Sequence, residues 1–361
     1  MEKHGFLAYK EGNKKYKTLL SNNTTIPIRK FLQSQGFEMP QILAFVVKEK
    51  TITIESEWIN GRDFFDLQKE KELTSEDFHK WGIFMAKMHD IKNDKGLSVA
   101  SRDLQFGNVI RCDDGRVMLC DYAKLYYTDF PEEEIIRHIL STYVSKKGYK
   151  DSFMKGYLTQ RGITLDKIIQ KALHVNWDNY HDLYCNGVLL RKGPRSNKRL
   201  NFLPKDMEGL RVADLGCSCG MLARESKRRG AKYVLAIDKQ HHSTHRLIDL
   251  VSLEAYAENL EIDCKAIDVA DGSCIKNTVF DIIFFCAVMG HLNCDRFEYL
   301  KMLRTKCKII FFETNLGGKE APHRQLLEKA GFTDIKCLGE SGDPDRESNS
   351  HYTMFKCKGD L

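Results

Sequence analysis

The chain has 361 residues, of which 42% are hydrophobic and 29% are charged, and it contains only seven prolines. This composition excludes a disordered or collagen-like chain and is typical of a folded protein. The net charge of +6, from 56 basic and 50 acidic residues, favours anionic ligands and leaves nucleic acid open as a partner without indicating it.

Cysteine spacing and hydropathy indicate the cellular compartment and argue against a membrane span. The 12 cysteines form no C-x-x-C pair, which argues against a zinc knuckle and against a disulfide framework. The N-terminus lacks an apolar secretory segment, and no run approaches the roughly 18 apolar residues that span a bilayer. We therefore expect a cytoplasmic protein with free thiols and no transmembrane segment. Peripheral contact with a membrane surface and the oligomeric state stay open.

The length indicates two domains of ordinary size, each able to bury a core of its own. The hydrophobic pattern weakens from Leu158 onward, and polar and basic residues gather between 192 and 199. Such stretches are typical of linkers. We predict a first domain over residues 1–160, a linker segment over 161–200 and a second domain over 201–361.

A strand and a helix are predicted early in the first domain. Residues 51–57 alternate between apolar and polar side chains, which is the period-two pattern of a strand. From Thr74 onward apolar residues recur at helical spacing, and Thr74 with Asp77 makes a capping box. The predicted helix ends near His89 and leads to a polar loop over residues 101–108.

This loop reads Ser-Arg-Asp-Leu-Gln-Phe-Gly-Asn, and a short apolar strand over 117–120 then ends in Asp121. Phosphoryl transfer needs a carboxylate that orients the attacking hydroxyl and acceptors that hold magnesium on the phosphates. Asp103 suits the first task as a catalytic residue, and Asn108 and Asp121 suit the second as metal ligands. A polar turn followed by an unrelated hairpin would explain the same residues without catalysis.

These residues resemble the small-molecule kinase branch of the protein-kinase-like fold, of which aminoglycoside phosphotransferases and lipopolysaccharide kinases are examples. The resemblance implies a small α+β domain that uses ATP with Mg²⁺. It also implies that a hinge from Glu57 to Ile59 meets adenine and that Lys17 or Lys15 meets the phosphates.

Several positions depart from that family's pattern. Ser101 stands where the family usually has histidine, and Tyr122-Ala123 stands where it has phenylalanine-glycine. Arg29 and Lys30 occupy the region where a glutamate partner for the lysine is expected. A degenerate domain that holds a substrate without phosphorylating it is therefore the alternative.

A strand, a turn, a helix and a second strand open the second domain. Residues 211–215 form the first predicted strand, Gly216 and Gly220 bracket the turn, and the second strand, 233–237, ends in Asp238. Glycines let the backbone approach a ligand, and an acidic residue about 20 positions later accepts hydrogen bonds from ribose hydroxyls. Dinucleotide-binding folds carry G-x-G-x-x-G here for a pyrophosphate, and this turn does not.

The spacing Asp214-x-Gly216-x-x-x-Gly220 resembles motif I of class I methyltransferases that use S-adenosylmethionine. The resemblance implies an α/β, Rossmann-like domain with a seven-stranded, mostly parallel sheet over residues 201–361, with some other doubly wound domain as the alternative. It places Asp268 at the adenine amine and His291 beside the transferred methyl. The cofactor-binding residues that it implies are Asp214, Gly216, Cys217, Gly220, Asp238, Asp268, Val269 and Cys286.

The methylated atom is harder to predict. No Asn-Pro-Pro-Tyr run follows the predicted fourth strand, 280–286, which argues against the amino-group methylases of DNA bases. No aspartate follows Phe285 and Cys286, which argues against the ribose methylases. An oxygen that is already anionic, in a phosphate or carboxylate, needs positioning but no base. His291 is a candidate catalytic base, or a residue that caps or packs its helix.

Together the two halves resemble the bifunctional enzymes that end bacterial O-antigen polysaccharide chains, with the order of the domains reversed. The leading hypothesis is ATP-dependent phosphorylation of a glycan or similar hydroxyl acceptor, followed by methylation of the phosphate, in polysaccharide biosynthesis. One alternative is a methyltransferase of RNA or a small molecule with a degenerate kinase-like domain that binds the substrate. Another is a regulatory protein that binds both ligands without turnover.

Overall fold

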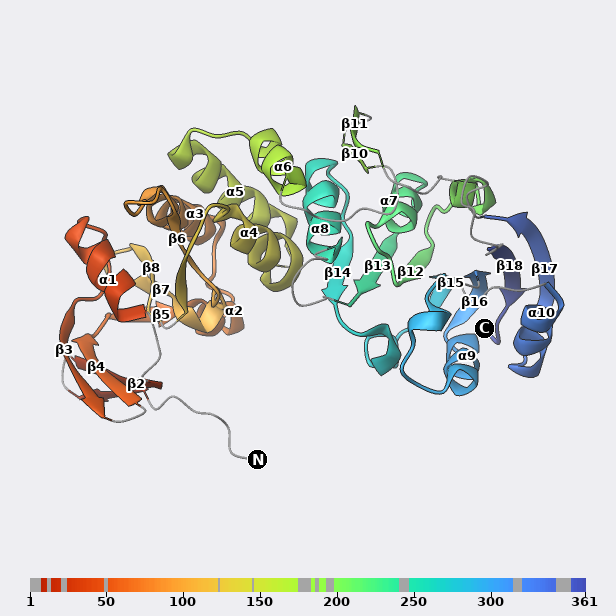
Figure 1. Ribbon diagram of the computed structural model, residues 1–361, viewed down its shortest axis with the longest axis horizontal. Coiled ribbons are helices and arrows are strands. Elements are labelled where there is room, and N and C mark those ends of the chain that lie inside the picture. The colour runs from red at the N-terminus through yellow and green to blue at the C-terminus, as the bar shows by residue number, and fades with distance from the viewer. Residues whose placement is uncertain are drawn as a thin grey trace. The chain divides into compact units, whose positions relative to one another are not determined.

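The structure is a computed structural model and describes residues 8–11, 14–20, 25–48, 51–122, 124–144, 146–174, 183–185, 188–192, 198–239, 247–313, 320–341 and 352–361. The chain divides into two compact units (Figure 1). Unit 1 comprises Met1–Ile139 and Tyr143–Ile168, and unit 2 comprises Leu140–Thr142 and Ile169–Leu361.

Unit 1 begins with a four-stranded antiparallel sheet in the order β1-β2-β4-β3. Its strands are β1 (Ala8–Glu11), β2 (Lys14–Leu20), β3 (Ile42–Lys48) and β4 (Thr51–Glu57). Helix α1 (Thr25–Ser34) connects β2 to β3. The strand predicted over 51–57 is confirmed as β4, and its alternating pattern buries Ile52 and Ile54 in a cluster with Ile26 of α1.

The rest of unit 1 is mainly helical, with one three-stranded sheet, β5-β7-β8, and one two-stranded sheet, β6-β9. Its elements, continuing into unit 2 at η2 and α6, are β5 (Gly61–Asp63), α2 (Phe64–Lys69), α3 (Ser75–Asp90), β6 (Ser98–Ser101), the 3₁₀ turn η1 (Phe106–Asn108), β7 (Val109–Cys112), β8 (Val117–Leu119), β9 (Leu125–Thr128), α4 (Glu132–Ile135), the π-helical segment η2 (Ile136–Tyr143), α5 (Lys147–Arg161) and α6 (Leu165–His174).

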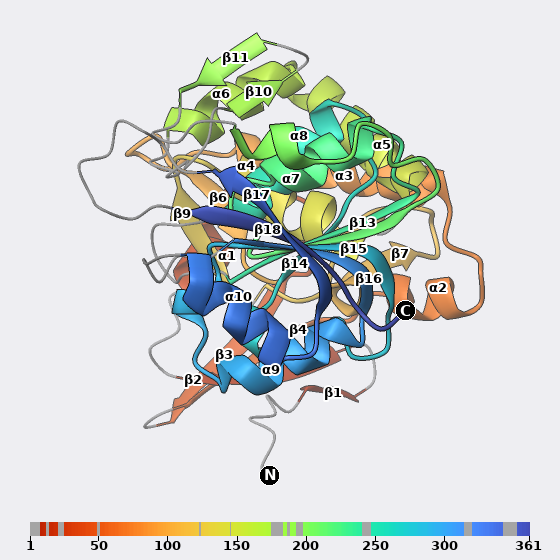
Figure 2. The same ribbon diagram turned by 90° about the vertical axis from the view of Figure 1, so that its right-hand side faces the viewer.

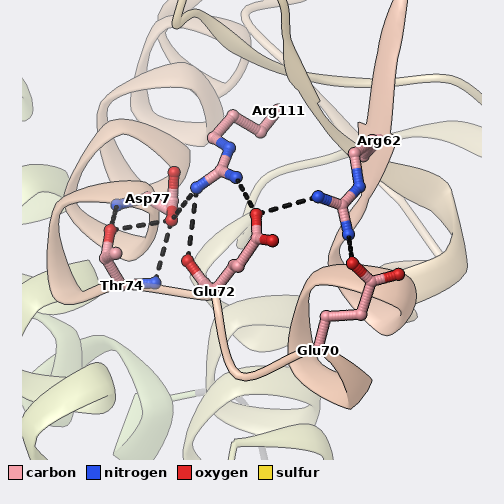
Figure 3. A network of polar contacts seen from close by, with 6 residues as sticks. All are labelled: Arg62, Glu70, Glu72, Thr74, Asp77 and Arg111. Carbon is pink, nitrogen blue, oxygen red and sulfur yellow. Dashed lines mark hydrogen bonds and ion pairs between the residues drawn. The ribbon is translucent and has the colours of Figure 1, made fainter.

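A polar network fixes the start of α3 (Figure 3). The Thr74 hydroxyl accepts from the N–H of Asp77 at 3.2 Å, and the Asp77 carboxylate accepts from the N–H of Thr74 at 2.9 Å, which is the predicted capping box. Arg111 of β7 reaches Asp77 at 3.3 Å and Glu72 at 3.3 Å. Arg62 of β5 also contacts Glu72, at 2.8 Å. The network therefore joins the helix start to β5 and β7.

Aromatic side chains on α3 and α5 make the core of unit 1. Phe78 and Trp81 of α3 are fully buried, as are Phe153 and Tyr157 of α5. The rings of Trp81 and Phe153 meet edge to face with centroids 5.2 Å apart. This packing holds α3 and α5 side by side (Figure 1).

Unit 2 is an alternating α/β arrangement. Beyond η2 and α6 its elements are β10 (Leu183–Cys185), β11 (Val188–Arg191), the 3₁₀ turn η3 (Lys198–Phe202), β12 (Arg211–Leu215), α7 (Met221–Arg228), β13 (Tyr233–Asp238), α8 (Leu247–Ala257), β14 (Asp263–Ala266), the turn η4 (Val269–Asp271), β15 (Phe280–Cys286), the turn η5 (Met289–His291), α9 (Arg296–Arg304), β16 (Cys307–Glu313), α10 (Glu320–Lys329), β17 (Thr333–Glu340) and β18 (Thr353–Lys358).

Its seven-stranded sheet has the order β14-β13-β12-β15-β16-β18-β17. The first five strands in this order run parallel, and β18 runs antiparallel to both β16 and β17. Helices α7 and α8 cover one face of the sheet, and α9 and α10 cover the other (Figure 2). Unit 2 is thus a mixed α/β fold, and its sheet has the seven, mostly parallel strands that were predicted.

Residues 161–200, the predicted linker segment, hold α6 and the hairpin of β10 and β11 in their described parts. No helix in the described ranges is long and apolar enough to cross a membrane.

Candidate functional site

The turn between β12 and α7 is built around two glycines with left-handed backbone. Gly216 has φ +76° and Gly220 has φ +69°. The N–H groups of Gly216 and Cys217 donate to the carbonyl of Ile237 at 2.8 and 2.9 Å, so the turn lies against the end of β13. A Cβ on Gly216 would come within 2.3 Å of Cγ2 of Val288. Glycine is therefore required here both for its φ angle and for space.

Asp238, at the end of β13, lies beside this turn. Its carboxylate accepts from the backbone N–H of Ser218 at 2.6 Å and from the backbone N–H of Lys239 at 2.7 Å. Ser218 itself has φ +51°, an uncommon angle for a residue with a side chain. The acidic residue predicted about 20 positions after the glycine turn is thus hydrogen-bonded to that turn.

Asp214 lies beneath the turn and is only 2% exposed. Its carboxylate accepts from the N–H of Ala223 at 3.1 Å, which holds the first turn of α7. Burial raises the pKa of Asp214 to about 7, with the nearby charge of Asp238 adding to the effect and Arg199 opposing it. This geometry makes Asp214 a support for the turn.

Asp268 and Val269 follow the end of β14. One oxygen of Asp268 accepts from the N–H of Ala270 at 3.0 Å, and the other lies 2.8 Å from the ammonium of Lys239. Val269 is buried, and its carbonyl accepts from the hydroxyl of Tyr299 at 2.8 Å. Asp268 and Asp238 are thus linked through the single residue Lys239.

The segment after β15 carries the last two predicted residues of unit 2. Cys286 is buried, and burial raises the pKa of its thiol well above the ordinary value, which argues against a reactive thiolate. Ala287, with φ +59°, turns the chain into η5, where His291 is exposed. An open hollow of about 680 Å³ begins at η5 and is lined by Met289, Leu292, Asn293, Cys294, Asp295, Arg296, Phe297 and Leu326.

A buried ion pair near the carboxyl ends of β15 and β16 was not predicted from the sequence. Arg199 of η3 is 8% exposed and donates from Nε to Glu313 at 2.9 Å, and a second bond from Nη2 makes the pair bidentate. Ser341 also donates its hydroxyl to Glu313. The sequence held one signal for this pair, a glutamate directly after the apolar run 309–312. Arg199 gave no signal, because it lay in a stretch interpreted as linker.

Unit 1 contains a pocket of about 360 Å³ that collects several predicted residues. Its lining is Lys15, Pro40, Ser56, Glu57, Trp58, Ile59, Gly61, Arg62, Asp63, Asp66, Gly107, Ile110 and Cys120. Lys15 donates from its ammonium to the carbonyl of Cys120 at 3.1 Å. Of the two candidate lysines, Lys15 therefore reaches this pocket. The backbone of Lys17 lies in β2, and its side chain falls outside what the structure describes.

Asp103, Asn108 and Asp121 are not among the lining residues of that pocket. The amide group of Asn108 donates to the carbonyl of Asp103 at 3.1 Å, and the carbonyl of Asn108 accepts from Cys120, the residue before Asp121, at 2.9 Å. The ammonium of Lys124 lies 3.0 Å from the Asp103 carboxylate. The structure therefore brings the 103–108 loop next to the strand end that carries Asp121.

Comparison with known proteins gives partial matches. No protein-family model matches the chain. A ribosomal protein L11 methyltransferase of Thermotoga neapolitana is 25% identical over 142 residues, which is 38% of this chain and 50% of that protein. A ubiquinone biosynthesis O-methyltransferase of Neisseria meningitidis is 33% identical over 97 residues, which is 26% of this chain and 39% of that protein. The chain thus spans half or less of the curated relatives that it matches.

Similar solved structures include a protein of Listeria monocytogenes that is named as an S-adenosylmethionine-dependent methyltransferase without proof of that activity. It is 15% identical, with a TM-score of 0.36 over 45% of this chain and 97% of that one. A crystal structure of WbdD is 16% identical, with a TM-score of 0.42 over 53% of this chain and 46% of that one.

Proposed function

We propose that unit 2 transfers a methyl group from S-adenosylmethionine to an acceptor. The observation that carries this proposal is the glycine turn after β12, whose backbone N–H at Ser218 bonds to the carboxylate of Asp238. The turn lies at the carboxyl ends of the parallel strands β12 and β13, where α/β sheets bind their ligands. The methyltransferase names of the partially matching relatives support the same activity.

The turn suits this cofactor better than a dinucleotide, because it lacks the G-x-G-x-x-G spacing that seats a pyrophosphate at the N-terminus of the following helix. S-adenosylmethionine carries no phosphate, and its sulfonium supplies an electrophilic methyl group. Asp238 would accept from the ribose hydroxyls and Asp268 from the adenine amine. The ammonium of Lys239, 2.8 Å from Asp268, orients that carboxylate.

For the acceptor we propose a small molecule. The hollow beside η5, at about 680 Å³, has the size of a small-molecule pocket, and Met289, Leu292 and Phe297 give it apolar walls. The names of the two relatives give different acceptors. One is named for ribosomal protein L11, and the other is named as an O-methyltransferase of ubiquinone biosynthesis. A neutral hydroxyl would need a base, for which His291 is the candidate, whereas a glycan phosphate would need none.

Calorimetric titration of the full chain with S-adenosylmethionine tests the cofactor. Asp238→Asn removes a charge that would hold the ribose, so we expect affinity to fall by about tenfold or more. Asp263→Asn is the matched control, because Asp263 loses the same charge at the amino end of β14, where its carboxylate meets Tyr233. Unchanged affinity in Asp238→Asn would contradict the proposed cofactor site.

The second candidate function is nucleotide binding by unit 1, of which phosphorylation of a glycan or similar hydroxyl is the more specific form. The pocket that joins Lys15 to Glu57 and Ile59 favours binding, and the bond from Asn108 to the carbonyl of Asp103 favours an ordered loop beside it. None of the relatives and structures reported above is named as a kinase. Phosphoryl transfer would also require magnesium on the phosphates.

Release of ADP from ATP and magnesium in the presence of sugar acceptors tests phosphorylation. A kinase that works through Asp103 would lose this release in Asp103→Asn, while S-adenosylmethionine affinity would stay as in the natural chain. Methylation of an unphosphorylated acceptor by Asp103→Asn would refute a scheme in which phosphorylation must come first.

A further inference from the structure

The turn between β12 and α7 contains one residue whose backbone angle would suit glycine better. Ser218 lies between Gly216 and Gly220 and has φ +51°. In this left-handed region a Cβ crowds the carbonyl oxygen that follows it, so residues other than glycine are strained there. Asparagine and aspartate are strained less, because their side chains form local hydrogen bonds, but this residue is a serine. The side chain of Ser218 therefore destabilises the turn that carries it.

The hydroxyl of Ser218 does not offset this strain within the described chain. Its oxygen is buried, and among the described residues it has no hydrogen-bond partner. Most buried hydroxyls in proteins have one, because water no longer reaches them. The residue as a whole is half-buried, so part of it faces outward from the turn, whereas Asp214 beneath the turn is 2% exposed. Contacts among the described residues therefore do not explain a serine at this position.

The backbone N–H groups around Ser218 are already hydrogen-bonded within the chain. Those of residues 216, 217 and 220 donate to backbone carbonyls at 2.8 or 2.9 Å. That of Ser218 donates to the carboxylate of Asp238 at 2.6 Å. A ligand could use any of these four donors only by breaking the bond that shapes the turn. The hydroxyl of Ser218 can donate to a ligand without breaking any of them.

The two ends of S-adenosylmethionine need different partners. Its ribose hydroxyls donate hydrogen bonds, and the carboxylate of Asp238 can accept them. Its amino-acid end carries a carboxylate, which accepts hydrogen bonds. Asp238 cannot serve that end, because an ionised carboxylate has no proton to donate. A serine hydroxyl can, and a hydrogen bond to a charged acceptor is stronger than one to a neutral acceptor.

We propose that the hydroxyl of Ser218 donates a hydrogen bond to the carboxylate at the amino-acid end of the cofactor. This inference rests on the S-adenosylmethionine site proposed for unit 2 and adds to it a residue that selects the complete cofactor over an adenosine fragment. The bond forms only with ligand, whereas the strain at φ +51° is present with and without ligand. Ser218 therefore weakens the ligand-free fold and strengthens binding, and the two effects can be measured separately.

Calorimetric titration of the full chain with S-adenosylhomocysteine and with methylthioadenosine tests the contact. Both compounds have adenine, ribose and a neutral thioether, but only the first has the amino-acid end. We expect Ser218→Ala to weaken binding of S-adenosylhomocysteine by about tenfold and to leave that of methylthioadenosine within about twofold. Equal weakening of both ligands, or of neither, would overturn the inference and leave the cofactor site. A natural chain that binds neither compound would overturn the inference and the cofactor site together.

Ser218→Gly separates the strain from the contact. Glycine relieves the strain, so we expect the ligand-free variant to unfold at a higher urea concentration than the natural chain, while S-adenosylhomocysteine binds about tenfold more weakly. Asn259→Gly is the matched control, because Asn259 is an exposed residue of the same unit with φ +58°. It should not lower the urea midpoint and should leave the affinity unchanged. Unchanged affinity in Ser218→Gly would overturn the role of the hydroxyl, and a lower urea midpoint would overturn the strain.

Discussion

Gly216, in the turn between β12 and α7, is constrained by backbone angle and by space at once. Gly216 and Gly209 have nearly the same φ, +76° and +75°, but differ in their surroundings. A Cβ on Gly216 would meet Val288 at 2.3 Å, whereas a Cβ on Gly209 would have nothing within 4 Å. The two glycines therefore separate the cost of the angle from the cost of the clash.

We predict that Gly209→Ala lowers the free energy of unfolding by about 1 kcal/mol and Gly216→Ala by about 2 kcal/mol more. Urea unfolding of the two variants measures both values. Combining Gly216→Ala with Val288→Ala should give less than the sum of the single effects, because the smaller side chain relieves the clash. Equal losses in the two alanine variants would contradict the steric argument.

Asp214 makes the stability of unit 2 depend on pH. Its pKa is about 7 in the fold against an ordinary value of 3.8, so between these values the folded chain holds a proton that the unfolded chain has lost. Its contribution to the free energy of unfolding therefore falls as pH rises from about 4 to about 7, and is constant above that.

We predict that Asp214→Asn removes this fall, because asparagine keeps the acceptor for the N–H of Ala223 and does not titrate. Urea midpoints at pH 5 and pH 7.5 provide the test. The natural chain should lose more stability between the two values than the variant, by about 1 kcal/mol or more. Parallel losses in both proteins would show that Asp214 is not the group concerned.

At the scale of elements, two arginines attach the turn η3 to the sheet and to the end of α7. Arg199 pairs with Glu313 at the end of β16. Arg229, after α7, donates to the carbonyls of Leu200 and Leu203 at 3.2 and 3.0 Å. These contacts hold η3 against unit 2 just before β12 begins.

Breaking the pair of Arg199 and Glu313 should be costly. We predict that Arg199→Met lowers the free energy of unfolding by about 3–5 kcal/mol, because it leaves a fully buried carboxylate without its cation. Arg199→Met combined with Glu313→Leu should be much less destabilised. Lys301→Met, which breaks an exposed pair with Glu298, is the control and should cost at most about 0.5 kcal/mol. Urea unfolding would contradict the argument if Arg199→Met matched that control.

At the scale of the whole molecule, each unit buries a core of its own. Unit 1 packs the aromatic residues of α3 and α5, such as Trp81 and Phe153. Unit 2 packs two layers of apolar side chains, one on each face of its sheet. Two separate cores allow two separate unfolding transitions.

We predict that scanning calorimetry of the full chain shows two transitions and that S-adenosylmethionine raises only one of them. A ligand stabilises the unit that binds it, by about 2.7 kcal/mol at a hundredfold excess over its dissociation constant. ATP should raise the other transition through the nucleotide site proposed for unit 1. A single transition that both ligands raise together would contradict independent units.

Local patterns in the sequence predicted a large part of unit 2 and the start of one helix of unit 1. The strand ends at Leu215 and Asp238, the glycine turn between them and the capping box at Thr74 all involve residues that are close in the chain. The seven-stranded sheet was predicted from the resemblance to class I methyltransferases that these segments carry. The roles predicted for His291, Asp103 and Asp121 stay predictions, because a role depends on a ligand.

By itself the sequence determined where the strands and the glycine turn of residues 201–361 lie, since hydrophobic period, glycine angles and caps act over a few residues. It missed α6 and the hairpin of β10 and β11, which lie in the segment predicted to be a linker. Only the tertiary structure decided that β18 enters between β16 and β17, that Arg199 meets Glu313, and that the guanidinium of Arg29 lies over the ring of Tyr122. These pairings join segments up to 114 positions apart. No local pattern encodes them, because they arise when whole elements pack and buried charges must find partners.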